Sequence, residues 1–314
     1  MPKIACIFPG QGSQYVGMGK TLFATSAGRE VLECGKRVLG EELIRVMLEG
    51  PEEELKQTTN TQPAILLSSI AAWRNLQASG FKLDYFAGHS LGEYSAYVAA
   101  GSLALEDALR VVRRRGELME RAFPEGKGAM LAVLGLETPK VEEACQQAKA
   151  ETGQVVVLAN YNCPGQVVIS GVKEGVQLAG NYAKELGAKR VLPLAVSGPF
   201  HSPLMKPVGE ALRPLLKDLE WRQPSAPVIA NVNAREIVER EDIPESLVGQ
   251  VSSAVLWEQS VRYLGLKGVN TFIELGPGKV LTGLVKKILP DATVMHGEDL
   301  SSLEKLLAYL KESR

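Results

Sequence analysis

The stretch that decides how this sequence folds is Leu83-Asp84-Tyr85-Phe86-Ala87-Gly88-His89-Ser90-Leu91-Gly92. Its mostly apolar first half, Leu83 to Ala87, predicts a short strand, and Glu93 to Ala100, rich in small side chains, predicts a helix. Gly-x-Ser-x-Gly between a strand and a helix is the pattern of a nucleophile elbow, a sharp turn that exposes the serine hydroxyl. The helix beginning beside Ser90 would direct free N–H groups toward an oxyanion formed there. Taken alone, the pentapeptide also fits an ordinary glycine-rich turn.

A general base for Ser90 can be sought among only three histidines, His89, His201 and His296. His89 is adjacent to Ser90, and consecutive side chains on a tight turn diverge. His296, near the C-terminus, fits a surface or strand-end position. His201 lies in Ser197-Gly198-Pro199-Phe200-His201-Ser202-Pro203, a stiff loop before a helix predicted from about residue 203. Such a loop can present a base to a distant serine, so His201 is the predicted base.

The bulk composition excludes several classes of protein. The chain has 314 residues, of which 45% are hydrophobic and 23% charged, as in ordinary globular proteins. Its formal net charge of −1 gives no overall attraction to nucleic acid or to an anionic membrane, so we expect neither as a partner. The longest apolar stretches, such as residues 64–73, are too short to cross a bilayer.

The cysteines and the N-terminal residues bear on the cellular compartment. Cys6, Cys34, Cys145 and Cys163 are widely spaced and have no metal-ligand pattern, which predicts reduced thiols and no metal site. The N-terminus leads directly into a strand predicted at residues 3–8 and leaves no room for a signal peptide. We therefore expect a cytoplasmic protein.

Residues 126–195 show a pattern of their own. Strands are predicted at 129–134, 155–160, 166–170 and 190–194, and helices at 139–150 and 173–186. The resulting order, β-α-β-β-α-β, is typical of a ferredoxin-like module. We therefore predict an inserted small subdomain at residues 126–195 and a large domain made of residues 1–125 and 196–314.

The segments that flank this module alternate between helices and strands, which predicts an α/β domain. Helices are predicted at 17–34, 41–48, 62–78, 106–122, 203–219, 245–264, from 279 and from 301, with strands at 227–230 and 270–275. Nucleotide-binding motifs are incomplete: Gln14 stands where a P-loop ending in Gly19-Lys20-Thr21 needs glycine, and Tyr15 replaces the last glycine of a dinucleotide fingerprint. We therefore expect no nucleotide cofactor.

Several ordered motifs together resemble the malonyl-CoA:acyl-carrier-protein transacylases, the discrete acyltransferases of bacterial fatty acid synthesis. The resemblance runs nearly end to end. It rests on Phe8 to Gln14, Gly88 to Tyr94, Arg115-Gly116 with Met119, Asn160 to Gln166, Phe200 to Met205, Gln250, and Glu274 to Gly278. It implies an α/β-hydrolase-like large domain with a ferredoxin-like small one, in agreement with the division read from the pattern.

The resemblance also implies a ping-pong transfer through a malonyl-serine intermediate. Ser90 would be the nucleophile and His201 its base, while the backbone N–H groups of Gln11 and Leu91 would form the oxyanion hole. A main-chain carbonyl near Gln250 would orient the histidine, so we predict a dyad without a third catalytic acid.

The resemblance further implies how the substrate would be held. The planar guanidinium of Arg115 could pair with the malonyl carboxylate in a bidentate manner, although an arginine run such as Arg113-Arg114-Arg115 also fits a solvated helix face. Neither Arg113 nor Arg114 matches a family position. The other expected substrate-binding residues are Gln250, Met119, Asn160 and Phe200.

The implied partners are malonyl-CoA and an acyl carrier protein, whose phosphopantetheine arm accepts the malonyl group; no cofactor is implied, and we expect a monomer. Because carrier proteins of this family are acidic, a basic patch of Lys189, Arg190, Lys286 and Lys287 is the candidate docking surface, and scattered solvated side chains are the alternative. Three other functions stay open. They are a serine esterase or thioesterase, a carrier-docking module without chemistry, and an acyltransferase of a polyketide pathway.

Overall fold

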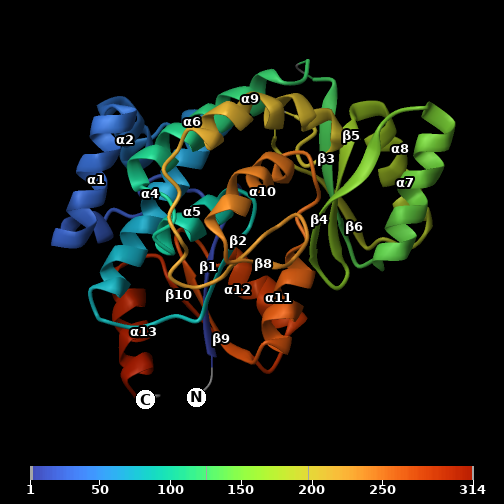
Figure 1. Cartoon of the computed structure of the whole chain (residues 1–314). Helices are drawn as coiled ribbons and strands as arrows, with labels where there is room; N and C mark the ends of the chain where they lie inside the picture. The colour runs from blue at the N-terminus through green and yellow to red at the C-terminus, as the bar shows by residue number, and fades with distance from the viewer. Residues whose placement is uncertain (1–2, 125, 197, 313–314) are drawn as a thin grey trace.

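A six-stranded sheet runs through the larger part of the molecule (Figure 1). The computed structural model describes residues 3–124, 126–196 and 198–312. The expectations for the first two residues and for Ser197 in the histidine loop therefore lie outside the described residues. The strand order is β10-β9-β1-β2-β7-β8, parallel throughout except for β8, which pairs antiparallel with β7. The strands are β1 (Lys3–Phe8), β2 (Tyr85–Gly88), β7 (Val228–Ile229), β8 (Glu236–Ile237), β9 (Val269–Leu275) and β10 (Thr293–Gly297).

Alternation along the central strands places apolar side chains on both faces of this sheet. In β1, Cys6 and Phe8 pack into the core beneath α4 and α5, whereas Ala5 and Ile7 pack on the opposite face with α11 and α12. A strand buried on both faces needs apolar residues at every position, which explains the unbroken run in β1. The helices around the sheet are α1 (Ser26–Leu39), α2 (Glu41–Glu49), α3 (Glu52–Leu55), α4 (Thr58–Gln77), α5 (Leu91–Ala99), α6 (Leu105–Arg121), α9 (Lys206–Lys217), α10 (Ile243–Gln250), α11 (Trp257–Leu266), α12 (Val280–Ile288) and α13 (Leu300–Glu312).

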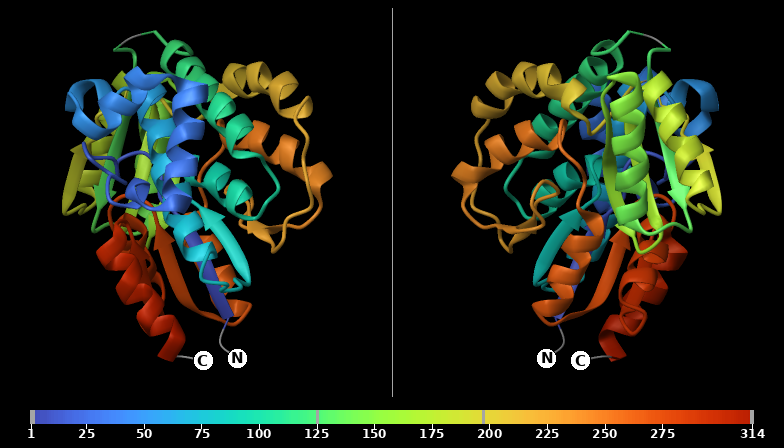
Figure 2. Two further views of the ribbon diagram at one scale, coloured as in Figure 1. Left: turned by 90° about the vertical axis from the view of Figure 1, so that its left-hand side faces the viewer. Right: turned by 90° about the vertical axis from the view of Figure 1, so that its right-hand side faces the viewer.

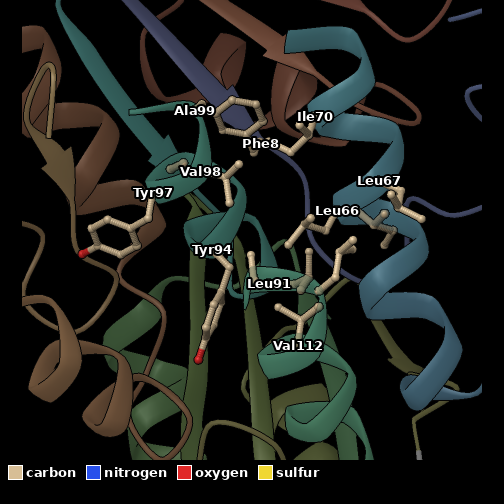
Figure 3. Close-up of a cluster of buried hydrophobic side chains, with 14 of the residues drawn as sticks. Phe8, Leu66, Leu67, Ile70, Leu91, Tyr94, Tyr97, Val98, Ala99 and Val112 are labelled. Carbon is tan, nitrogen blue, oxygen red and sulfur yellow. The ribbon is translucent and has the colours of Figure 1, made fainter. Parts of the chain in front are cut away.

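The helix α5, which follows the elbow, is enclosed by other elements. All nine of its residues are buried, and Figure 3 shows Leu91 and Val98 of α5 near Leu66 and Ile70 of α4. Val112 of α6 belongs to the same core. Packing on several sides holds the N-terminus of α5 in a fixed place, so the serine that precedes it is also fixed.

A second, four-stranded antiparallel sheet lies beside the first, on the right of Figure 1. Its order is β4-β5-β3-β6, and the helices α7 and α8 cover its outer face. Its elements are β3 (Gly128–Leu134), α7 (Thr138–Thr152), β4 (Val156–Cys163), β5 (Gln166–Val172), α8 (Lys173–Glu185) and β6 (Arg190–Pro193). Hydrogen bonds join β4 to the larger part of the molecule, because Tyr161 N donates to Val255 O at 2.9 Å and Val255 N to Ala159 O at 2.8 Å.

Several predicted boundaries were wrong. The helix predicted at 62–78 begins at Thr58, so Pro63 lies inside α4 as its sixth residue, beyond the first turn. Proline has no N–H to donate to the Thr59 carbonyl one turn earlier, and that carbonyl accepts a hydrogen bond from Arg113 Nη1 at 3.4 Å. The helix predicted at 17–34 is a short 3-10 turn at Leu22–Ala24 followed by α1. Residues 251–256 separate α10 from α11, so the stretch 245–264 is not continuous. The short strand β8 and the edge strand β10 were not predicted.

Both described ends of the chain lie at one end of the molecule. Figure 2 shows the start of β1 and the end of α13 close together in two opposite views. Within the part of the chain that the structure describes, no helix combines the length and the apolar character needed to cross a membrane. All four cysteines are buried and free.

Candidate active site

Ser90 occupies a strained turn between β2 and α5. Its backbone has φ of 51° and ψ of −108°, which is rare for a residue with a side chain. The glycines on either side allow this turn to pack closely. A Cβ atom at Gly88 would lie 2.0 Å from the carbonyl of Gly92, and one at Gly92 would lie 2.0 Å from the carbonyl oxygen of Phe8. The turn therefore requires glycine at both flanking positions.

Two amide side chains from distant parts of the chain hold the backbone of Ser90. The Ser90 N–H donates to Asn231 Oδ1 at 2.7 Å, and Gln250 Nε2 donates to the Ser90 carbonyl oxygen at 2.8 Å. Asn231 Nδ2 also donates to the carbonyl oxygen of Gly88 at 2.7 Å. The strained conformation is thus fixed by hydrogen bonds on both sides of the residue.

His201 faces the serine hydroxyl. The distance from Ser90 Oγ to His201 Nε2 is 2.7 Å, and both residues have positive φ. The other ring nitrogen, Nδ1, lies 3.1 Å from the carbonyl oxygens of both Gln250 and Ser253. Since carbonyl oxygens only accept hydrogen bonds, Nδ1 carries the proton and Nε2 presents a lone pair to the serine hydroxyl.

The surroundings of His201 keep its imidazole neutral. Burial lowers the pKa of His201 to about 3, and the positive charge of Arg115 contributes further. The carbonyls of Gln250 and Ser253 act in the opposite direction. A neutral imidazole beside the hydroxyl is the form that can accept a proton.

Arg115, on α6, brings a buried positive charge to the same hydroxyl. Its side chain has an exposed fraction of 0%, and Nη2 lies 3.2 Å from Ser90 Oγ. Nη2 also donates to Gln250 Oε1 at 3.1 Å, and Nη1 donates to Gln62 Oε1 at 2.8 Å. Burial lowers the pKa of Arg115, partly offset by the charges of Tyr94 and Glu93, and Nε has no hydrogen-bond partner among the described residues. A buried cation whose hydrogen bonds go to the neutral side chains of Gln62, Gln250 and Ser90 is suited to an anionic ligand.

The other two arginines of the run lie outside this site. Arg113 donates to Asn60 Oδ1 at 2.8 Å, and Arg114 pairs with Glu117 at 2.9 Å. Both side chains are partly exposed. Only the third arginine of the run therefore reaches the serine.

A pocket of about 90 Å³ opens above Ser90 and His201. Five other residues predicted for the site line this pocket, namely Gln11, Leu91, Met119, Asn160 and Phe200. Arg115 and Gln250 are fully buried and are not among the pocket-lining residues; they contact the Ser90 hydroxyl and the Ser90 carbonyl oxygen, respectively. As the first residue of α5, Leu91 has a backbone N–H without a partner inside the helix.

The remaining histidines do not contact the serine hydroxyl. His89 Nε2 lies 2.9 Å from Asn162 Oδ1, and its ring lies beside that of Trp257. His296 is in the edge strand β10, with Glu298 3.9 Å away. Within the described ranges, no group of three or more His, Cys, Asp or Glu side chains could hold a metal ion.

Three residues of the site were not found from the sequence: Gln62, Asn231 and Glu93. Each is buried and is connected to Ser90 directly or through one intermediate side chain. Glu93 follows Ser90 by three positions and carries a carboxyl group into an apolar helix, which is the one signal that the sequence offered. Asn231 and Gln62 have no local signal, because their partners are distant in the chain.

Similarity to known proteins shows the class of protein to which this chain belongs. The family model described as the acyl transferase domain matches residues 5–304 of this chain. Together with the elbow serine and its histidine, this match defines an acyl transferase. The chain is also 48% identical to the malonyl CoA-acyl carrier protein transacylase of Bacillus subtilis strain 168, over 99% of this chain and 98% of the relative. The corresponding protein of Staphylococcus aureus strain MW2 is 44% identical, over 97% and 98% of the two chains.

Solved structures of similar proteins have the same fold as this chain. An acyl carrier protein S-malonyltransferase from Vibrio cholerae superposes with a TM-score of 0.93 at 44% identity, over 97% of this chain and 99% of that one. A malonyl-transacylase solved in complex with a type II PKS acyl-carrier protein has a TM-score of 0.94 at 43% identity, over 98% and 99%. The chain therefore belongs to the family of malonyl CoA-acyl carrier protein transacylases, and the resemblance and the α/β fold class predicted from the sequence are confirmed.

Proposed function

We propose that this chain transfers a malonyl group from malonyl-CoA to the phosphopantetheine thiol of an acyl carrier protein in fatty acid synthesis. The observation that carries the proposal is the convergence of two groups on Ser90 Oγ. His201 Nε2 lies 2.7 Å from this oxygen and Arg115 Nη2 lies 3.2 Å from it. A nucleophile, a base and a buried cation at one point suit an acyl group that ends in a carboxylate. The names of the close relatives support the same activity.

In the first half-reaction, Ser90 Oγ attacks the thioester carbonyl of malonyl-CoA while its proton passes to His201 Nε2. The negative charge that develops on the carbonyl oxygen is stabilised by the backbone N–H groups of Leu91 and Gln11. Collapse of the tetrahedral intermediate breaks the carbon–sulfur bond, and the CoA thiolate takes the proton from His201. Ser90 is left as a malonyl ester.

In the second half-reaction, the carrier thiol gives its proton to His201 and attacks the ester carbonyl. Ser90 Oγ then leaves and recovers the proton. Both steps exchange one ester for another, so no cofactor or metal is required by this chemistry. The Gln250 and Ser253 carbonyls hold His201 in one tautomer throughout, in the place that a carboxylate occupies in a catalytic triad.

The malonyl carboxylate would also act on the base. The charge of Arg115 lowers the pKa of His201 and so opposes proton transfer from Ser90. A carboxylate paired with Arg115 would offset that charge at the moment when the imidazolium forms. Malonyl is therefore favoured over acetyl in the chemical step as well as in binding.

The catalytic residues belong to the large domain in the division that we propose, residues 1–125 with 196–314. Residues 126–195 form the smaller, ferredoxin-like part. It contributes Asn160 to the pocket.

The proposal is tested by the intact mass of the protein after incubation with malonyl-CoA, with acetyl-CoA as the control. We expect one malonyl group per chain, which leaves the enzyme when a holo carrier protein is added. A non-catalytic docking module would give no adduct, and an esterase would hydrolyse short-chain nitrophenyl esters instead. A carrier from a polyketide pathway is the second acceptor to test, because one similar malonyl-transacylase was solved with a type II PKS carrier.

His201→Ala should slow the acylation of Ser90 by roughly a hundredfold or more, the usual size of a general-base contribution. The measurement is the time course of the malonyl adduct. His296→Ala, in the edge strand β10, is the matched control and should acylate at the rate of the unaltered protein. An undiminished rate in His201→Ala would mean that another group, such as His89, serves as the base.

The carrier half-reaction should slow as salt is added, because docking of an acidic carrier depends on a basic patch. Lys287 Nζ donates to Gln166 Oε1 at 3.3 Å. Gln166 of β5 and Arg190 of β6 both lie opposite Leu134, one on each side of strand β3, so Gln166 links the regions of Lys287 and Arg190. Lys286 differs from Lys287 in its partner, because Lys286 Nζ donates to a main-chain carbonyl, that of Ala292, at 2.6 Å.

The test neutralises Lys189, Arg190, Lys286 and Lys287 together. We expect a weaker salt dependence of carrier transfer and little change in acylation by malonyl-CoA. If the salt dependence of carrier transfer is the same after all four are neutralised, the docking surface lies elsewhere.

A further inference from the structure

Glu93 is a buried carboxyl group for which the transfer chemistry has no direct use. It lies in the first turn of α5, three residues after Ser90, and its exposed fraction is 0%. Burial raises the pKa of Glu93 to about 7, partly offset by hydrogen bonds from Gln250, Asn231 and Tyr97. Burying a carboxyl group costs stability unless hydrogen bonds compensate, and Glu93 accepts such bonds from Gln250, Asn231 and Tyr97.

The contacts of Glu93 lead to both sides of the nucleophile. Its Oε2 accepts hydrogen bonds from Gln250 Nε2 at 2.9 Å and from the backbone N–H of Asn231 at 3.0 Å. These are the two residues that hold the carbonyl and the N–H of Ser90. A single oxygen atom therefore ties together the two supports of the strained turn.

The same contact sets the orientation of the Gln250 amide. Because Nε2 of Gln250 faces Glu93 and the Ser90 carbonyl, its Oε1 faces Arg115 Nη2 at 3.1 Å. With the amide reversed, an NH₂ group would face the guanidinium, and neither could accept a hydrogen bond. Glu93 thus fixes the position of Arg115 as well as that of Ser90.

We propose that Glu93 is a positioning residue for the transfer reaction, whose Oε2 holds Gln250 and Asn231 so that Ser90 and Arg115 keep their places. This inference rests on the proposed function. It predicts that loss of the acceptor at Oε2 slows acylation and also weakens the preference for malonyl over acetyl. A residue that only stabilised the fold would change the amount of active protein, but neither the rate per active site nor the preference.

The test compares three substitutions at one position. Glu93→Gln keeps an acceptor oxygen of the same reach, while its NH₂ group can donate to the Tyr97 hydroxyl; we expect rates within about threefold of the unaltered protein. Glu93→Leu leaves the Asn231 N–H and one Gln250 proton unpaired, and should lower the acylation rate per site by about tenfold or more. Glu93→Asp shortens the side chain by one methylene group and should lower the acylation rate per site to a smaller extent than Glu93→Leu.

Tyr97→Phe is the matched control. The Tyr97 hydroxyl donates to the other carboxyl oxygen, Oε1, at 3.4 Å, and this oxygen holds neither Gln250 nor Asn231. Figure 3 shows the Tyr97 side chain pointing away from α4, on the other side of α5 from Leu66. The substitution alters the same carboxyl group without touching the supports of Ser90, and we expect unchanged rates and preference.

The readouts are the acylation rate constant with malonyl-CoA and with acetyl-CoA, each divided by the fraction of protein that is acylated at saturation. Glu93→Asp gives the same readouts if Glu93→Leu does not fold. The inference is overturned if the Asp and Leu variants that fold keep the normal rate per site and the normal preference, or if Tyr97→Phe has the same effect. If the unaltered protein forms no malonyl adduct, the proposed function itself fails; if it does and the variants match it, only this inference fails.

Discussion

Ser90→Ala should abolish both the malonyl adduct and the transfer to the carrier, with a loss of roughly three or more orders of magnitude in rate. Alanine keeps the Cβ atom and the backbone N–H that donates to Asn231, so the elbow should persist. What disappears is the hydroxyl oxygen, which lies within 3.2 Å of both His201 Nε2 and Arg115 Nη2. The measurement is intact mass after incubation with malonyl-CoA.

Ser95→Ala is the matched control for this experiment. Ser95 lies on the same helix, is buried, and has an Oγ without a hydrogen-bond partner among the described residues. Its loss should leave labelling unchanged. Stable labelling of Ser90→Ala would show that another side chain is the acylated nucleophile.

The elbow and the histidine loop could be predicted from the sequence because their signals are local. Gly88 and Gly92 flank Ser90 within five residues, and the strand and helix around them have clear apolar patterns. The chain also has only three histidines, so elimination could identify His201. The β-α-β-β-α-β order could be predicted for the same reason, since each element carries its own periodicity.

The residues that support Ser90 could not be predicted from local pattern, because they depend on contacts between distant residues; Gln250 was expected at the site only through the family resemblance. Asn231 and Ser90 are 141 positions apart, and Gln250 and Ser90 are 160 apart. Gln250 fits the pattern of an exposed helical glutamine, yet the structure buries it completely. Pro63 marks a helix start by local rules, whereas α4 begins five residues earlier and buries this proline in the core.

Arg115→Ala should remove most of the preference for malonyl-CoA over acetyl-CoA. The side chain is fully buried, reaches Ser90 Oγ at 3.2 Å, and retains an unpartnered Nε–H, so a carboxylate on an acyl group attached to Ser90 would have a donor within reach. Truncating one partner of a desolvated charge pair costs on the order of 2–5 kcal/mol, which is a loss of tens to thousands in malonyl transfer. Acetyl transfer should fall less, because acetyl has no charge left unpaired.

Two further substitutions distinguish the loss of the ion pair between Arg115 and the malonyl carboxylate, the carboxylate clamp, from a general disturbance of the site. Arg115→Lys should recover only part of the loss, since an ammonium group cannot form the planar fork of a guanidinium. Arg114→Ala, one position away on the exposed side of α6, should leave both substrates unaffected because Arg114 pairs with Glu117 and not with a residue of the site.

The decisive quantity is kcat/KM for both substrates in the unaltered protein and in Arg115→Ala. The Arg115 charge also lowers the pKa of His201, so its removal makes the imidazole a better proton acceptor for any acyl group. The stronger base therefore restores part of the acetyl transfer that is lost with the packing of Arg115, whereas malonyl transfer loses its ion pair as well. The malonyl-to-acetyl ratio should collapse or invert, and an equal fall for both substrates would falsify the carboxylate clamp and leave Arg115 a structural residue.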